Sequence, residues 1–199
     1  MVSHSLGTVG AMALAARDHR MTVDEFFVAT EGLSKAQLID GELVVVDSPA
    51  ARHHRIILWL SYLHLTFAQG HPGAGHLGMD SDVPIGDHNV YVPDLYWVPD
   101  DQRLANDQSR FPSPPPLVVE VRSPSTWRYD IGTKLRHYES SGVAEVWLVD
   151  TAADVVLVYR RSGPEIPTFD IALELTAEDT LTTPLVPGWD VDLGELFTR

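Results

Sequence analysis

The N-terminal part of the chain combines a helix start signal with a hairpin signal. Residues 22–25 (Thr-Val-Asp-Glu) have the form of a capping box, in which the threonine and the glutamate each bond the other's backbone N–H group where a helix begins. Residues 37–39 and 42–47 are strand-like and flank Asp40-Gly41, a pair that favours a two-residue hairpin turn. We therefore predict a short helix followed by a β-hairpin that ends before Pro49.

A long helix is predicted next, because residues 51–69 carry apolar side chains at helical spacing over a length too great for a typical strand. The glycine- and proline-rich segment 70–75 ends this helix. Strand-like pieces and a proline-rich loop follow; the pieces cover residues 76–79, 82–85 and 90–98, and the loop covers residues 99–116.

The second half of the chain alternates strands with one more helix. Residues 117–121 (Leu-Val-Val-Glu-Val) are almost wholly apolar, as in a central strand covered on both faces. Residues 128–141 predict a helix that stops at Gly142. Strand-like segments then cover residues 143–150, 155–161 and 167–175, before a turn-rich C-terminal end. This order of elements is typical of an α/β or α+β fold with a mixed central sheet flanked by helices.

Size and composition favour a single globular domain. The chain has 199 residues, of which 44% are apolar, and this suffices for a hydrophobic core. The apolar stretch 9–16 is followed rather than preceded by positive charge, unlike a signal peptide, so we expect an N-terminal extension over residues 1–20 and one domain over residues 21–199. No apolar run approaches the roughly 20 residues that span a bilayer, and cysteine is absent. We expect a soluble, cytoplasmic protein.

The formal net charge of −14 argues against broad electrostatic binding to nucleic acid. The charge is unevenly distributed, because residues 120–161 hold six acidic and six basic side chains while the rest of the chain holds 22 acidic and eight basic ones. The simplest explanation of the acidic excess is a surface that keeps the protein in solution.

Two carboxylates stand in apolar strand sequences, where a charge needs an explanation. Asp94 follows Pro93 within residues 90–98, and Glu120 interrupts the apolar run 117–121. Burying an unpaired carboxylate is costly, so such a group usually has a cation, a set of hydrogen-bond donors or a raised pKa. Each carboxylate is therefore either a structural group held by hydrogen bonds or a metal ligand.

Lys134 could connect these carboxylates to a reaction. Asp130, Lys134 and Tyr138 are four residues apart and share one face of the predicted helix, either as a surface ion pair or with the lysine directed toward the strand of Glu120. In the second case, carboxylate oxygens of Asp94 and Glu120 would suit Mg²⁺ or Mn²⁺. Lys134 would then orient a water molecule or stabilise charge on a phosphoryl group.

The sequence resembles a known family over roughly residues 21–197. The resemblance rests on Leu117-Val-Val-Glu-Val-Arg-Ser-Pro-Ser-Thr126, on Tyr129-Asp130, Lys134 and Tyr138, and on Gly142-Val-Ala-Glu-Val-Trp-Leu-Val-Asp150. Upstream it includes Leu38-Ile-Asp-Gly-Glu42, His53 and Val92-Pro93-Asp94, and downstream it includes Pro187-Gly188 and residues 191–197. The family is Uma2, which is assigned to the PD-(D/E)XK nuclease fold.

The resemblance implies a restriction-endonuclease-like core that hydrolyses DNA with the help of a divalent metal. It implies metal binding by Asp94, Glu120 and the backbone carbonyl of Val121. The lysine that usually stands two residues after the glutamate is replaced by Arg122, which stays protonated at any ordinary pH, so the lysine role passes to Lys134. The supporting residues that it suggests are Glu42, His53, Arg122, Asp130 and Tyr138.

Two functions stay open at this point. The first is a Mg²⁺-dependent endonuclease, which the joint presence of Asp94, Glu120 and Lys134 favours. The second is a non-catalytic binding or assembly module with the same fold, which the acidic composition and Gln37 favour, because the family usually has a glutamate at that position. Symmetric cutting of a duplex by the first would call for a homodimer.

Overall fold

The computed structural model describes residues 20–31, 36–46 and 48–198. The extension expected over residues 1–20 lies outside the described residues except for Arg20, whose side chain bonds the backbone carbonyl of Asp40 at 2.9 Å. Among the described residues, no helix is long and apolar enough to cross a membrane.

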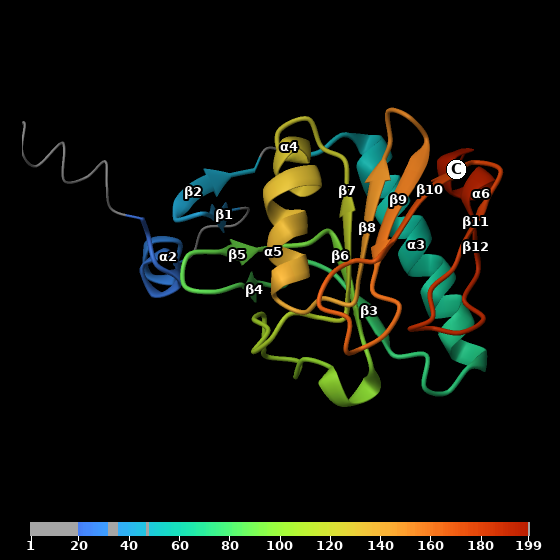
Figure 1. Ribbon diagram of the computed structural model, residues 1–199, viewed down its shortest axis with the longest axis horizontal. Helices are drawn as coiled ribbons and strands as arrows, with labels where there is room; N and C mark the ends of the chain where they lie inside the picture. The colour runs from blue at the N-terminus through green and yellow to red at the C-terminus, as the bar shows by residue number, and fades with distance from the viewer. Residues whose placement is uncertain (1–19, 32–35, 47, 199) are drawn as a thin grey trace, which may run out of the picture.

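A six-stranded mixed sheet forms the centre of the fold (Figure 1). The strand order is β10-β9-β8-β7-β6-β3, and only the β7–β8 pair is parallel. The strands are β3 (His76–Gly78), β6 (Leu95–Val98), β7 (Leu117–Val121), β8 (Glu145–Asp150), β9 (Val155–Arg160) and β10 (Ile171–Thr176). The expected mixed α/β fold class is thus confirmed.

Helices cover both faces of this sheet (Figure 1). The long helix α3 (Ala51–Gly70) packs on one face, as its apolar spacing predicts. The other face carries the crossover between the parallel strands, which consists of α4 (Trp127–Tyr129), the π-helical turn η2 (Asp130–Lys134) and α5 (Leu135–Ser140). The predicted helix 128–141 is therefore present, but its central turn is wider than an α-helical turn.

A smaller sheet stands beside the main one, with the order β2-β1-β5-β4. Its strands are β1 (Ala36–Ile39), β2 (Glu42–Val45), β4 (Val83–Pro84) and β5 (Val90–Tyr91). The expected hairpin is confirmed by the β1–β2 pairing. Asp40 and Gly41 have φ angles of 52° and 79°, and a Cβ on Gly41 would lie 2.6 Å from that of Arg20, so glycine is required there.

The strand expected over residues 90–98 is in fact two strands that belong to different sheets. β5 pairs with β1 and β4, whereas β6 pairs with β3 and β7. Pro93 between them lacks the N–H group that ladder pairing needs, so the chain leaves one sheet and enters the other at Pro93-Asp94. This break exposes Asp94 at the end of a main-sheet strand.

The remaining elements lie at the ends of the chain and in the proline-rich loop. Helix α2 (Val23–Ala29) begins with the predicted capping box of Thr22 and Glu25. The loop contains a single 3₁₀ turn, η1 (Asp100–Gln102). The C-terminal end was expected to be turn-rich, but it also forms β11 (Thr180–Leu181), β12 (Val191–Asp192) and helix α6 (Leu193–Thr198).

Strand β7 lies between two hydrophobic clusters. Side chains alternate along a strand, so Leu117, Val119 and Val121 pack with α3 on one face. Val118 packs with Tyr138 of α5 on the other. Glu120 has the same parity as Val118, so it is directed to the α5 face with only 3% of its surface exposed.

Candidate active site

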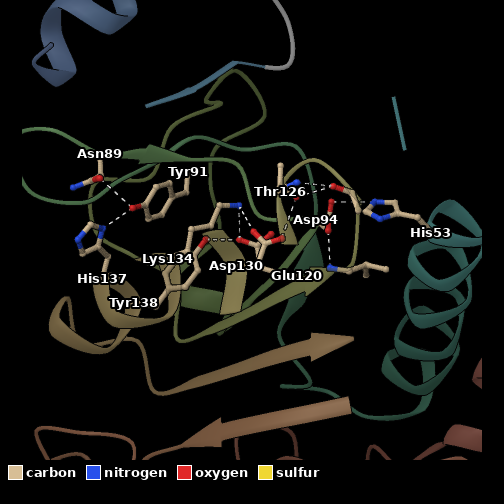
Figure 2. A network of polar contacts seen from close by, with 12 residues as sticks. His53, Asn89, Tyr91, Asp94, Glu120, Thr126, Asp130, Lys134, His137 and Tyr138 are labelled. Atoms are coloured by element: carbon tan, nitrogen blue, oxygen red, sulfur yellow. Dashed lines mark hydrogen bonds and ion pairs between the residues drawn. The ribbon is translucent and has the colours of Figure 1, made fainter. Parts of the chain in front are cut away.

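Asp94 is held at the end of β6 by contacts from two neighbouring elements (Figure 2). Its Oδ2 accepts a hydrogen bond from the backbone N–H of Val121 at 2.7 Å. Its Oδ1 lies 3.2 Å from Nε2 of His53, which comes from the first turn of α3. Leu95 pairs with Val119, so Asp94 stands beside Glu120 at the next position of the β6–β7 ladder.

Glu120 is held by two side chains of the crossover helix. Its Oε1 accepts hydrogen bonds from Nζ of Lys134 at 3.1 Å and from the hydroxyl of Tyr138 at 2.7 Å. The ammonium of Lys134 also lies 2.9 Å from Oδ1 of Asp130, so it bridges two carboxyl groups. Asp130 in turn accepts a bond from the hydroxyl of Thr126 at 3.0 Å. These bonds form one buried polar network (Figure 2).

The local sequence explains how Lys134 reaches the strand. Asp130 begins and Lys134 ends the π-helical turn, and both side chains are 1% exposed. The connection from β7 to the parallel strand β8 returns over the sheet, so the helix that follows Glu120 packs directly above it. The sequence expectation that Lys134 is directed toward the strand of Glu120 agrees with these contacts.

Burial and charge shift the ionisation of this network. Burial raises the pKa of Glu120 to about 8, although the Lys134 ammonium and the Tyr138 hydroxyl lower it. Burial also raises the pKa of Asp130, again against the charge of Lys134. For Lys134 burial alone would lower the pKa, but the two carboxyl groups outweigh it and hold the pKa above the ordinary lysine range. Lys134 is therefore a permanent cation at neutral pH and not a proton acceptor.

The pKa of His53 is also shifted by a neighbouring carboxylate, that of Asp94. Burial alone would lower the pKa of the imidazole, but the hydrogen bond and the charge of Asp94 outweigh it and raise the pKa. Only 5% of the surface of His53 is exposed. The imidazole thus fixes the direction of the Asp94 carboxylate.

Asp94 and Glu120 open into one cleft between the two sheets. Its volume is about 950 Å³, which is in the size range of ligand-binding pockets. Four of the residues singled out from the sequence line it, namely His53, Asp94, Glu120 and Lys134. The two carboxylates line the same cleft, but each is bonded to its own protein partners.

The other supporting residues lie behind or beside the cleft. Asp130 and Tyr138 contact Lys134 and Glu120 from the buried side. Arg122 forms an ion pair with Asp150, in which Nη1 lies 2.9 Å from Oδ1 and 2.8 Å from Oδ2. Glu42 is exposed on β2. The structure therefore brings neither Arg122 nor Glu42 to the lining of the cleft.

Three further lining residues were not assigned a role from the sequence. Gln37 was noted only as a departure from the family pattern, yet its side chain lines the cleft with a buried Oε1 that has no hydrogen-bond partner among the described residues. Phe27 and Arg110 line the far wall, where the guanidinium carbon lies 3.1 Å from the ring centroid. A polar residue within a buried strand is a signal that could have identified Gln37, but no local pattern pairs Phe27 with Arg110.

The donor groups of the cleft fit a hydrated divalent cation better than a closed metal cage. No cluster of three or more histidine, aspartate or glutamate side chains is arranged to hold a metal among the described residues. Mg²⁺, however, usually keeps several waters and takes only one or two carboxylates. Asp94 and Glu120 supply two such carboxylates, and the Val121 carbonyl belongs to the residue whose N–H bonds Asp94.

The fold and the carboxylate-lined cleft define a nuclease-like α/β protein. Residues 23–194 match the family model of Uma2, described as "Putative restriction endonuclease", and the chain belongs to this family. The fold resembles the crystal structure of a putative nuclease of the DUF820 group from Anabaena variabilis ATCC 29413, with a TM-score of 0.74 and 19% sequence identity over 89% of this chain and 98% of that chain. No match was found among curated proteins.

Proposed function

We propose that this chain is a Mg²⁺-dependent endonuclease that hydrolyses phosphodiester bonds in DNA, with Mn²⁺ as an alternative ion. The observation that carries the proposal is the joint lining of one cleft by Asp94, Glu120 and the permanently charged Lys134. Asp94, Glu120 and the Val121 carbonyl would hold the ion. When bound, the ion would polarise the phosphoryl group and activate a water molecule.

The protein groups around the cleft would position the substrate and stabilise charge. Lys134 cannot accept a proton, so its ammonium serves to stabilise negative charge on the phosphoryl oxygens. Tyr138 and Asp130 hold Glu120 and Lys134 in place. His53 does the same for Asp94.

A non-catalytic binding or assembly module is the second candidate function. It is favoured because the side chain of Lys134 is 1% exposed and its ammonium is already bonded to two carboxyl groups. Such a network also stabilises a fold in the absence of any reaction. Gln37 in place of an acid further lowers the negative charge available to a cation.

A cleavage assay with two isosteric variants separates these functions. Glu120→Gln and Asp94→Asn replace each proposed metal-binding carboxyl group by an amide of the same size. In the nuclease proposal each lowers the rate of Mg²⁺-dependent DNA cleavage by about 100-fold or more, since loss of one stabilising group at a reaction centre costs roughly 3–4 kcal/mol. The rates are measured on plasmid, linear duplex and single-stranded DNA with Mg²⁺ and with Mn²⁺.

Glu145→Gln is the matched control, because Glu145 is equally buried in the neighbouring strand but does not line the cleft. Its carboxylate is bonded to Trp147, Arg160 and Thr183. This variant should lose stability but retain cleavage per folded molecule. Wild-type protein that cleaves none of the three substrates, while remaining folded, would favour the non-catalytic module.

Three expectations, on the oligomeric state, the domain limits and the cellular location, stay predictions. We propose a homodimer for symmetric cutting of duplex DNA, which sedimentation equilibrium would test. We retain the domain limits of residues 21–199, with residues 1–20 as an extension, and limited proteolysis at that junction would test them. A cytoplasmic location stays a prediction from composition, and cell fractionation would test it.

A further inference from the structure

A second cavity adjoins the cleft at Arg110. It has a volume of about 510 Å³ and lies in the proline-rich loop between η1 and β7. Arg110 lines both cavities, so they meet at this side chain. The polar side chains of Asp101, Gln102, Arg103 and Gln108 line the second cavity with Arg110, and we call this cavity the arginine groove.

The two arginines of the groove are available to an anion. Four arginines elsewhere in the fold are paired with a carboxylate, namely Arg20, Arg52, Arg122 and Arg160. Neither Arg103 nor Arg110 forms an ion pair with another described residue. The groove thus holds two guanidinium groups beside a single carboxylate, that of Asp101.

Phe27 fixes the orientation of Arg110. The guanidinium lies on the ring of Phe27 with its carbon 3.1 Å from the centroid. This stacking uses the flat face of the guanidinium and leaves its N–H groups at the edge free to bind a phosphate, for which their planar arrangement is suited. Asp82 lies beside Arg110; burial raises the pKa of its carboxyl group, and the charge of Arg110 lowers that pKa in part.

The apolar part of the cleft lining suits an unpaired nucleotide. Phe26, Met79 and Val92 line the cleft together with Gln37. Gln37 is 6% exposed and its Oε1 has no hydrogen-bond partner among the described residues, so it can accept a hydrogen bond from the amino group of a base. In a double helix the base faces are stacked and the pairing edges are occupied, so only an unpaired nucleotide can present both to such a lining.

We propose that the substrate is an unpaired DNA strand whose phosphate backbone lies in the arginine groove and whose scissile nucleotide enters the cleft. The inference rests on the proposed nuclease function and narrows its substrate to single-stranded DNA or single-stranded extensions of a duplex. A single strand has no two-fold axis, so this substrate does not require the homodimer.

Binding in the presence of a metal chelator tests the groove without cleavage. Fluorescence anisotropy compares a labelled oligodeoxycytidine, whose bases carry amino groups, with a blunt duplex of the same length, over a range of salt concentrations. Wild-type protein should bind the single strand more tightly than the duplex. The double variant Arg103→Ala, Arg110→Ala should weaken single-strand binding about tenfold and reduce the slope of log K against log salt by about 0.7 for each lost phosphate contact.

Arg128→Ala is the matched control, because Arg128 is also exposed and also lies on an aromatic ring, that of Tyr129, but lines neither cavity. It should leave both affinity and slope unchanged. Equal binding of duplex and single strand, or a double variant that binds like wild type, would overturn the inference. If DNA is cleaved, either result leaves the nuclease proposal intact. Tight binding of the single strand without any cleavage would overturn the nuclease proposal but would still support the arginine groove as a binding site for single-stranded DNA.

Discussion

Glu120 is buried beside an ammonium, a phenol and a second carboxyl group, so its protonation is coupled to folding. Its pKa is raised to about 8 by burial, while an unfolded glutamate titrates near about 4.3. The folded protein therefore binds the proton more tightly than the unfolded chain. By linkage, the free energy of unfolding should fall as pH rises from about 5 to about 8.

Glu120→Gln removes this titrating group, so the fall in stability over the same range should be smaller than in wild type. Urea unfolding at several pH values, with a chelator present, measures the free energy of unfolding of both proteins. The raised pKa values of Asp130 and His53 contribute a fall of the same sign to both proteins, so the difference between the two curves reports Glu120 together with its coupling to Asp130. Parallel curves would contradict the assigned shift.

Two buried glutamates show which properties of a single residue could be predicted from the sequence and which could not. Glu120 stood out because it interrupts an apolar run, and this predicted its burial correctly. Glu145 begins an equally apolar strand and is 1% exposed, yet it is a structural group that Arg160 and Trp147 satisfy. Local sequence does not tell the two roles apart, because partners such as Tyr138 of Glu120 and Thr183 of Glu145 lie 18 and 38 residues away.

At the scale of elements, the small sheet is attached to the crossover helix through contacts of Tyr91 and Asp40 with His137. The hydroxyl of Tyr91 on β5 lies 2.5 Å from Nδ1 of His137 on α5 and donates to Oδ1 of Asn89 at 3.0 Å (Figure 2). Asn89 also accepts from the backbone N–H of Asp40 in the hairpin turn at 2.8 Å. This network joins the sheet that carries Gln37 to the helix that carries Lys134.

Tyr91→Phe should lower the free energy of unfolding by about 1–3 kcal/mol, because it removes the hydroxyl that bonds both His137 and Asn89. Amide hydrogen exchange should accelerate more in β1 and β5 than in β7 and β8, since the small sheet loses its attachment. Tyr159→Phe is a suitable control, because the hydroxyl of Tyr159 has no hydrogen bond within the described residues. Uniform acceleration in both sheets would show that they unfold as one unit.

Prediction of the elements succeeded where side-chain periodicity is decisive and failed where pairing partners decide. Helix α3 and strand β7 follow from periodicity. The division of residues 90–98 between two sheets depends on which strands flank each half, and this information is not local. The π-helical turn is also invisible in the apolar spacing, because it changes the path of the helix without changing which residues are apolar.

At the scale of the molecule, the fold resembles that of a solved putative nuclease at 19% sequence identity, and the fold class was predicted from the sequence. The positions of the two arginines that form no ion pair among the described residues were not predicted. Arg103 and Arg110 stand in a loop that also contains Asp100, Asp101 and Asp107, so the sequence there has no basic character. Only the folded loop places both arginines in one groove.

The net charge of −14 gives the whole molecule a general affinity for cations, so a metal site in the cleft must be separated from that background. Mg²⁺ bound only by the folded protein should raise the free energy of unfolding by about 2.7 kcal/mol at a concentration 100 times its Kd. Thermal unfolding with Mg²⁺, compared with NaCl at equal ionic strength, measures the excess. Asp94→Asn should abolish the excess and Glu145→Gln should retain it. An excess that survives Asp94→Asn would place the ion on the acidic surface, and the cleft would then lack the metal on which the nuclease proposal depends.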